Sequence, residues 1–331
     1  MADNKKIRLG ALNVGEYSMW GIWAKALSPQ GPFGSALLNM EVTHCWDVNP
    51  QLAAEFADQY GCEVVEDYDG MLGKVDAIAF GGLYEVPWQH RLARPYVEAG
   101  VPTYLSRPFS YRLQDIDELL DLAAKNSTPI IATTVFEHFI QGAILKSRLP
   151  AIGVIKSVYG VCNSGEYPGH FHLPPLLLRV IGYDVDQVSL LTDDERDCSY
   201  LQQTLLFKGN DNQPPFLATL HASQNVPYAY LHVVGEKGSE TIEMTRSPDS
   251  RETLYHFFAP QLLDMHKTFQ GEQYQPLDAI RKKTQVFLAG YYSHLEKGGS
   301  FAALDNLPAD WSPRHFKPGW IDESMFKRPA T

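Results

Sequence analysis

The sequence has few of the features that mark secreted, membrane or thiol-redox proteins. Only four of its 331 residues are cysteines, they are widely scattered, and none form a C-x-x-C pair. This pattern indicates neither a metal motif nor a disulfide framework, and it is typical of reduced thiols in the cytosol. There is no run of about 18 apolar residues, as a membrane span would need. The polar start at residues 1–6 leads into an apolar stretch too short for a signal peptide. We therefore expect a cytoplasmic protein.

Positive charge is also scarce. Lysine and arginine total 28 against 39 aspartate and glutamate residues, which gives a net charge of −11. Nucleic acids and anionic membranes need a basic surface, so neither is expected as a partner. A neutral small molecule such as a carbohydrate is compatible with this charge. The length suits two domains, each with its own core.

The first 135 residues alternate between strand and helix patterns. Short apolar runs rich in β-branched residues are separated by stretches with helical spacing, and Asn49 followed by Pro50 marks one helix start. Single helices between strands indicate right-handed βαβ units and a parallel sheet. The strands are expected at 7–12, 41–46, 62–65, 75–80, 103–106 and 130–135, and the helices at 19–27, 50–60, 89–98 and 113–125.

The pattern changes near Glu137. Strands now follow one another at 157–162, 201–207, 216–222, 228–234 and 239–244, before two helices at 259–269 and 277–297. Turn-rich linkers between several strands favour antiparallel pairing. We therefore predict an α/β protein in which residues 1–137 form a doubly wound Rossmann domain. Residues 138–331 are predicted to form an α+β domain with a large, mostly antiparallel open sheet and a C-terminal tail.

A complete G-x-G-x-x-G dinucleotide motif is missing after the first strand. Residues 13–18 read Asn-Val-Gly-Glu-Tyr-Ser, so Gly15 keeps the position where the backbone approaches a pyrophosphate. Asn13 replaces the first glycine and tolerates left-handed backbone better than most residues. Ser18 is a small substitute for the third, and Glu16 and Tyr17 complete the candidate cofactor-binding turn. An ordinary strand-to-helix turn without a ligand is an equally open interpretation.

Asp47 ends the second strand. A carboxylate at this place can accept both ribose hydroxyls and repels a 2′-phosphate, which favours NAD over NADP. The spacing from the turn is longer than usual, because residues 28–38 resemble an inserted loop. A solvated carboxylate at a strand end is the alternative.

Several segments together resemble one enzyme family. They are Val-Asp-Ala-Ile-Ala-Phe at 75–80, Glu-Ala-Gly at 98–100, Thr-Tyr-Leu-Ser-Arg-Pro at 103–108 and Val-Gly-Glu-Lys-Gly-Ser at 234–239. In order and spacing, from about residue 7 to about residue 303, the chain resembles a divergent member of the glucose–fructose oxidoreductase, inositol dehydrogenase and rhizopine catabolism (Gfo/Idh/MocA) family. The resemblance implies NAD-dependent oxidation of a secondary hydroxyl of a sugar, glycoside, sugar acid or cyclitol. It also implies a homo-oligomer, a dimer or tetramer.

The resemblance also identifies departures from the family's catalytic motifs. Arg107 stands where the family's Glu-Lys-Pro motif has a lysine beside the nicotinamide, Ser106 replaces the glutamate, and Pro108 is kept. Arginine stays protonated, so Arg107 can hold a substrate oxygen but cannot act as a base. A structural arginine at a strand end is the alternative.

A histidine is the candidate general base. The resemblance places His172 on the histidine of the family's Asp-x-x-x-His motif, with Pro168 in place of the aspartate. Histidine suits the transfer of a hydroxyl proton near neutral pH. His170 competes for the role, and a surface loop without a catalytic function remains the alternative.

Further candidates follow the parallel strands. Glu137 and His138 come after the last of them, and the loop after 75–80 carries Gly81, expected beside the cofactor, and Trp88, which can stack on a sugar face. Arg179 lies further along the helix of His172. Trp88 is equally compatible with burial, and Arg179 with an exposed or ion-paired arginine.

Two other functions stay open. The altered motifs are compatible with lyase, hydrolase or isomerase chemistry on a sugar, assisted by a recycled NAD or by a metal held by His170, His172 and Glu137. A non-catalytic partner subunit is the other alternative. The leading interpretation needs no metal.

Overall fold

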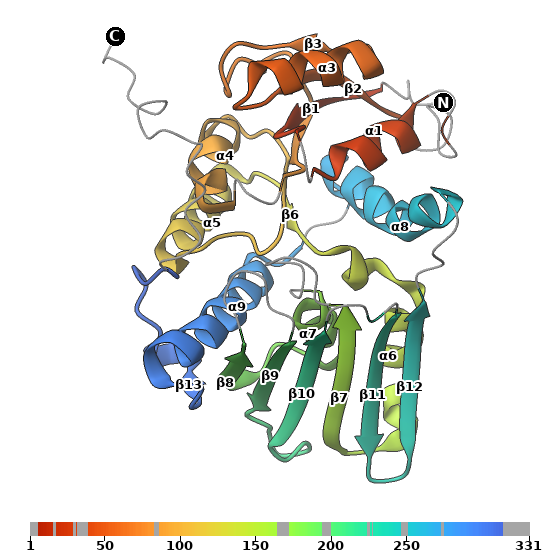
Figure 1. The fold of residues 1–331 in the computed structure, drawn as a ribbon, viewed down its shortest axis with the longest axis vertical. Coiled ribbons are helices and arrows are strands. Elements are labelled where there is room, and N and C mark those ends of the chain that lie inside the picture. The colour runs from red at the N-terminus through yellow and green to blue at the C-terminus, as the bar shows by residue number, and fades with distance from the viewer. Residues whose placement is uncertain are drawn as a thin grey trace.

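The chain folds around two β-sheets, one above the other in Figure 1. The computed structural model describes residues 6–15, 18–28, 31, 39–82, 86–163, 172–193, 200–223, 226, 228–245, 251–272 and 275–313. Among the helices in these ranges, none combines the length and apolar character needed to cross a membrane.

The N-terminal sheet has six strands in the order β3-β2-β1-β4-β5-β6, and every neighbouring pair is parallel. This is the strand order of a dinucleotide-binding Rossmann sheet, and it brings the carboxyl ends of all strands to one edge. The predicted parallel sheet is confirmed. Its strands are β1 (Ile7–Leu12), β2 (Met40–Trp46), β3 (Glu63–Val64), β4 (Ala77–Phe80), β5 (Thr103–Leu105) and β6 (Ile130–Ala132).

The helices described between these strands are α1 (Trp20–Leu27), α3 (Pro50–Tyr60), α4 (Gln89–Glu98) and α5 (Leu113–Asn126). The start of α3 follows from its sequence. The Asn49 side chain accepts a hydrogen bond from the backbone N–H of Gln51 at 3.0 Å, and Pro50 occupies the first turn. The helix ends at Gly61, whose left-handed backbone (φ 73°) satisfies the last turn.

The second sheet has seven strands in the order β12-β11-β7-β10-β9-β8-β13. All neighbours are antiparallel except β7 and β10, which are parallel. The mostly antiparallel sheet is thus confirmed, whereas β8 and the short β13 were not predicted. The strands are β7 (Ile155–Asn163), β8 (Val185–Thr192), β9 (Tyr200–Phe207), β10 (Phe216–Ser223), β11 (Tyr228–Gly235), β12 (Ser239–Thr245) and β13 (Ala302–Ala303).

Helix α9 contacts both sheets, at β6 and at β8, whereas α6 and α7 pack on the second sheet. Helix α8 lies beside α1, and α9 lies beside α5 and β8 (Figure 1). Short 3-10 turns follow β4, β6 and β13. The elements are α6 (Ile140–Ile152), α7 (Leu173–Ile181), α8 (Arg251–Phe269), α9 (Leu277–Lys297), η1 (Val86–Trp88), η2 (Val135–His138) and η3 (Leu304–Asn306).

Candidate active site

The turn after β1 has the backbone that its sequence predicts. Asn13 adopts a left-handed conformation with φ 59°, which confirms its expected substitution for glycine. The Ser18 hydroxyl donates to the carbonyl of Asn13 at 2.7 Å and accepts from the N–H of Trp20 at 3.2 Å. Ser18 therefore links the turn to the start of α1. Glu16 and Tyr17 lie outside the described residues.

Asp47 anchors this turn. It is 5% exposed, and its two carboxylate oxygens accept from the N–H groups of Gly15 and Asn49, each at 2.9 Å. Burial raises the pKa of Asp47, and these backbone donors oppose the rise. A Cβ at Gly15 would stand 2.6 Å from Leu52 Cδ1 and 3.3 Å from Asp47 Oδ2, so a larger residue here would require the Leu52 side chain to move. Each carboxylate oxygen has a second lone pair with which it can accept a ribose hydroxyl.

Gly81, which follows β4, forms backbone hydrogen bonds to residues on both sides of this turn. Its N–H donates to the carbonyl of Leu12 at 3.1 Å, and its own carbonyl accepts from Met19 at 2.9 Å. A Cβ at this position would overlap Ser18 Oγ and the ring of Trp20. The structure thus gives Gly81 a packing role between β4 and α1. Direct contact of Gly81 with a cofactor stays a prediction.

The buried side-chain amides of Asn13 and Gln89, near the carboxyl ends of β1 and β5, are compatible with a bound ligand. Both amide atoms of Asn13 and the Nε2 of Gln89 have no hydrogen-bond partner among the described residues, although these side chains are 1% and 0% exposed. Gln89 Oε1 accepts from the N–H of Ser106, just after β5, at 2.9 Å. An unsatisfied buried polar group costs about 1–3 kcal/mol, so such groups are expected to bond to water or a ligand. The residues present therefore fit a nucleotide at the carboxyl ends of β1 and β5.

Arg107 follows β5 directly. The peptide bond from Arg107 to Pro108 is cis, and Phe109 has a φ of 83°, an uncommon value for a bulky residue. Burial raises the pKa of Tyr104, and the positive charge of Arg107 opposes this rise. The Tyr104 hydroxyl donates to the Thr133 carbonyl at 2.8 Å. Arg107 thus belongs to the region where β5 and β6 end.

His172 approaches the same region from the other sheet. It caps the N-terminus of α7, is 8% exposed, and stacks on Phe136 of η2 with the ring centroids 4.6 Å apart and an interplanar angle of 24°. Because η2 follows β6, this contact brings a histidine of the C-terminal half against the carboxyl edge of the parallel sheet. The competing His170 and the substituted Pro168 lie outside the described residues.

Glu137 takes part in a buried ion pair. Lys283 of α9 is 0% exposed, and its Nζ donates to the Glu137 carboxylate at 2.9 and 3.1 Å and to the Ala132 carbonyl at 2.6 Å. Glu137 also accepts from the N–H of Thr134 at 2.8 Å, as part of a capping box. Burial lowers the pKa of Lys283, and Glu137 opposes that shift.

His138 has internal partners at both ring nitrogens. Its Nδ1 lies 2.7 Å from Asp264 of α8, and its Nε2 lies 2.7 Å from the Thr133 hydroxyl. Burial lowers the pKa of His138, although Asp264 counteracts it. Arg179 lies 3.4 Å from the same Asp264 oxygen. Direct contact of substrate with Glu137, His138 or Arg179 stays a prediction, since the structure gives all three protein partners.

Trp88 lies in η1, partly buried, with the guanidinium of Arg91 5.5 Å from its ring centroid. Its stacking on a sugar also stays a prediction. Within the described ranges, no three His, Cys, Asp or Glu side chains are grouped so that they could hold a metal ion.

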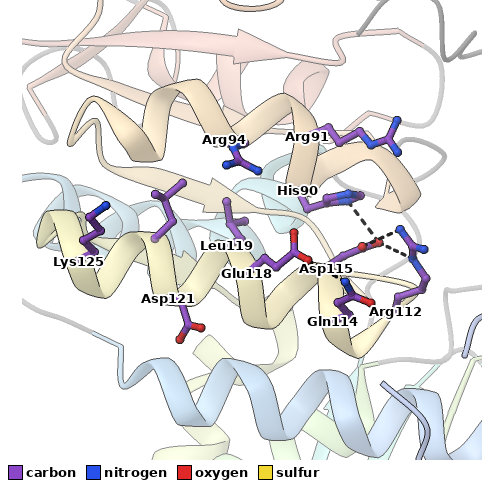
Figure 2. Close-up of a pocket in the computed structure, with 11 residues that line it drawn as sticks. His90, Arg91, Arg94, Arg112, Gln114, Asp115, Glu118, Leu119, Asp121 and Lys125 are labelled. Atoms are coloured by element: carbon purple, nitrogen blue, oxygen red, sulfur yellow. Dashed lines mark hydrogen bonds and ion pairs between the residues drawn. The ribbon is translucent and has the colours of Figure 1, made fainter. Parts of the chain in front are cut away.

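A hollow of about 550 Å³ lies between α4 and α5 (Figure 2). Arg112 and Asp115 form a two-bond ion pair there at 2.7 and 2.9 Å, and His90 lies 3.5 Å from Asp115. Burial lowers the pKa of His90, and Asp115 opposes this. Neither the glycine turn, Arg107 nor His172 lines the hollow. We therefore do not place the reaction there.

The sequence analysis did not identify Lys283, Asp264 or Gln89. Lys283 sits in the run Arg-Lys-Lys at 281–283, which is typical of a solvated face. Its spacing from the buried residues Ile280 and Phe287 places it on the inner stripe of the helix. This helical spacing was the feature of the sequence from which the burial of Lys283 could have been predicted.

Comparisons with known proteins agree with this geometry. Residues 24–134 match the model of an oxidoreductase family with an NAD-binding Rossmann fold (GFO_IDH_MocA). In sequence, no curated protein matches the chain significantly.

Solved structures match over nearly the whole chain. Apo scyllo-inositol dehydrogenase from Lactobacillus casei has a TM-score of 0.75 at 13% identity, covering 92% of this chain and 99% of the other. The same enzyme with NAD(H) and scyllo-inositol gives 0.72 at 15% identity, covering 91% and 100%. An oxidoreductase from Agrobacterium radiobacter in complex with NAD+, L-tartaric acid and magnesium gives 0.71 at 13% identity, covering 92% and 100%. At these identities the likeness shows the fold, and the family match over residues 24–134 supports the resemblance found in the sequence. Residues 24–134 are thus similar to the Gfo/Idh/MocA oxidoreductase family, and the whole chain shares the fold of the solved dehydrogenases.

Proposed function

We propose that this protein is an NAD-dependent oxidoreductase that oxidises a secondary hydroxyl of a sugar, glycoside, sugar acid or cyclitol. The observation that carries the proposal is the stacking of His172 on Phe136 at the carboxyl edge of the parallel sheet. It joins the two halves of the chain where ligands bind in open α/β sheets. The nearby unpartnered amides of Asn13 and Gln89 support a ligand at this edge.

The glycine turn and its neighbours would hold the cofactor. Asp47, whose carboxylate already accepts from the Gly15 N–H, would also accept ribose hydroxyls, and this supports NAD over NADP. When bound, NAD+ supplies the hydride acceptor. The full proposed set is Asn13, Gly15, Glu16, Tyr17, Ser18, Asp47, Gly81 and Pro108.

The substrate would lie between Arg107 and His172. His172 accepts the proton of the reacting hydroxyl, and Arg107 donates hydrogen bonds to a substrate oxygen. A guanidinium also binds a carboxylate well, which supports sugar acids as substrates. The hydroxy-diacid in the Agrobacterium radiobacter structure is compatible with this class. Trp88 would contribute apolar contact.

Nucleotide binding and turnover test the proposal together. We expect NAD to stabilise the purified protein by about 2.7 kcal/mol at a concentration 100 times its Kd, and NADP to do so less. NADH absorbance should then appear with at least one member of a panel of inositols, hexoses, aldonic acids and uronic acids. The protein without polyol is the control. Absence of stabilisation by either nucleotide would contradict the proposal.

The replacement of the family lysine by Arg107 favours one alternative, sugar chemistry without net redox change. The same panel of polyols and sugar acids distinguishes a dehydrogenase from an enzyme without net redox change. Conversion of a sugar with NAD bound but no accumulation of NADH would support lyase, hydrolase or isomerase chemistry. Conversion that needs NAD turnover would support the dehydrogenase.

We also propose that the open face of the second sheet joins copies of this chain. Register places Tyr159, Leu191, Tyr200 and Leu217 on one outward face, each at least 43% exposed. In the five strands β7 to β11, the residues in register with them on that face include no Asp, Glu, Lys or Arg. An extensive uncharged surface is typical of an interface.

Light scattering tests this interface. The wild-type protein should have a mass of at least twice 37.2 kDa. Leu217→Arg should shift it to the monomer, because a charge would be buried without a partner. Leu72→Arg, at an exposed leucine of the other half, should leave the mass unchanged. A monomeric wild-type protein would refute the proposal.

A further inference from the structure

A cavity of about 950 Å³ lies between α6, α7 and α8. Its size is that of a small-molecule site. Asn13, Arg107 and His172 do not line it. Glu137, His138 and Arg179, which the sequence predicted as substrate contacts, do line it. The cavity therefore differs in its lining from the proposed site between Arg107 and His172 but shares these three candidates.

Apolar side chains from all three helices form most of its wall. They are Ile140, Leu176, Val180, Pro260 and Leu263. Ile140 and Leu263 are 68% and 42% exposed, so apolar surface is open to a ligand at this place. Helices α6 and α7 approach closely at Gly142, where a Cβ would stand 2.9 Å from Leu176.

Three cations from three helices also line the cavity: Lys146, Arg179 and Lys267. The Lys146 ammonium donates to the Arg179 carbonyl at 3.0 Å, and Arg179 reaches Asp264 at 3.4 Å. Lys267 lies one helical turn beyond Asp264 on α8. All three cationic side chains therefore line the same cavity.

The carboxylates in the wall are already engaged. Asp264 bonds to His138 at 2.7 Å, and Glu137 bonds to Lys283 at 2.9 Å. Three cations line the cavity together with two carboxylates, and Glu137 pairs with Lys283, whereas Asp264 pairs with Arg179 as well as with His138, in a chain with a net charge of −11. The cavity thus combines an apolar wall with a local excess of positive charge.

We propose that this cavity binds an amphipathic anion, an acyl or aryl carboxylate. The hydrocarbon part lies against Ile140, Leu176 and Leu263, and the carboxylate pairs with Arg179, Lys146 and Lys267. Charge-assisted hydrogen bonds to arginine and lysine fix the head group, and apolar burial holds the body. The proposal does not depend on NAD or on a polyol substrate.

Calorimetric titration of the whole protein with three probes separates the contribution of the ligand's negative charge from that of its hydrocarbon chain. Octanoate is expected to bind. Octylamine has the same chain length and the opposite charge, and acetate has the charge without the chain. Both should bind at least tenfold more weakly than octanoate. Equal affinity for octanoate and octylamine would reveal non-specific apolar binding, and no binding of octanoate would equally overturn the proposal.

Variants locate the site. Arg179→Gln and Lys267→Gln should each weaken octanoate at least tenfold, and Ile140→Asp should do the same from the apolar wall. Arg148→Gln is the matched control, because Arg148 is exposed on α6, pairs with Glu240 and does not line the cavity. If these substitutions leave the affinity for octanoate unchanged, octanoate does not bind in this cavity. Displacement of octanoate by a polyol substrate would show one shared site and overturn the separate cavity.

Discussion

Replacing Lys283 by methionine is expected to lower the free energy of unfolding by about 3–5 kcal/mol. The ammonium is fully buried and forms three hydrogen bonds, two to Glu137 and one to the Ala132 carbonyl. Methionine fills a similar volume but leaves the Glu137 carboxylate, whose side chain is 1% exposed, without a counter-charge. The ammonium also lies 4.9 Å from the ring centroid of Phe109, so a cation–π contact is lost as well. Urea denaturation at neutral pH measures the change.

Two further variants show whether the buried charge is the cause. Combining Lys283→Met with Glu137→Gln removes both charges, while the glutamine oxygen still accepts from Thr134. The double variant should therefore recover part of the lost stability. Lys282→Met, at the neighbouring and less buried lysine, should cost well under half as much. Equal unfolding midpoints for wild type and Lys283→Met would refute the structural role of this pair.

His172→Ala is expected to lower turnover by about 10²–10⁴-fold, as the loss of a general base does. By transition-state theory this corresponds to about 3–5 kcal/mol in the activation barrier. NAD affinity should stay the same, because His172 contacts η2 and is not part of the glycine turn. The experiment uses the best polyol from the panel and compares kcat and KM with those of the wild type.

A second variant separates chemistry from packing. Phe136→Leu removes the ring on which His172 stacks but keeps an apolar side chain and the histidine. We expect a smaller loss of turnover, because the proton acceptor remains but is less well oriented. His44→Ala, in β2, serves as the matched histidine control. An unchanged kcat in His172→Ala would exclude this histidine as the base.

The elements that could be predicted are those whose signals are local. The cap at Asn49 and the left-handed backbone of Asn13 depend on neighbouring residues, and both were visible in the sequence. Helix α6 was missed because it contains Pro150 and because the exposed Ile140 and Ile144 blur the apolar stripe of Gly142, Leu145 and Ile152. Strand β8 was missed because Asp186 and Gln187 interrupt its apolar alternation.

The candidate site shows the same division. The sequence places Arg107, Glu137 and His138 at the ends of parallel strands, and the structure does so too. It does not reveal their partners, because His138 meets Asp264 across 126 residues and Glu137 meets Lys283 across 146. Such pairings depend on the packing of α8 and α9 against the first sheet. No local sequence pattern predicts which residues that packing brings together.

The pairing of Glu137 with Lys283 also constrains the order of events during synthesis. At about 5–20 residues per second, the ribosome adds Lys283 roughly 7–30 s after Glu137, because 146 residues separate them. During that interval the carboxylate at the end of β6 has no ammonium to meet, although every strand of the parallel sheet has already been made. The nascent N-terminal half must therefore keep Glu137 hydrated or protonated until α9 emerges. The buried ion pair at the end of β6 therefore forms only after α9 has been made.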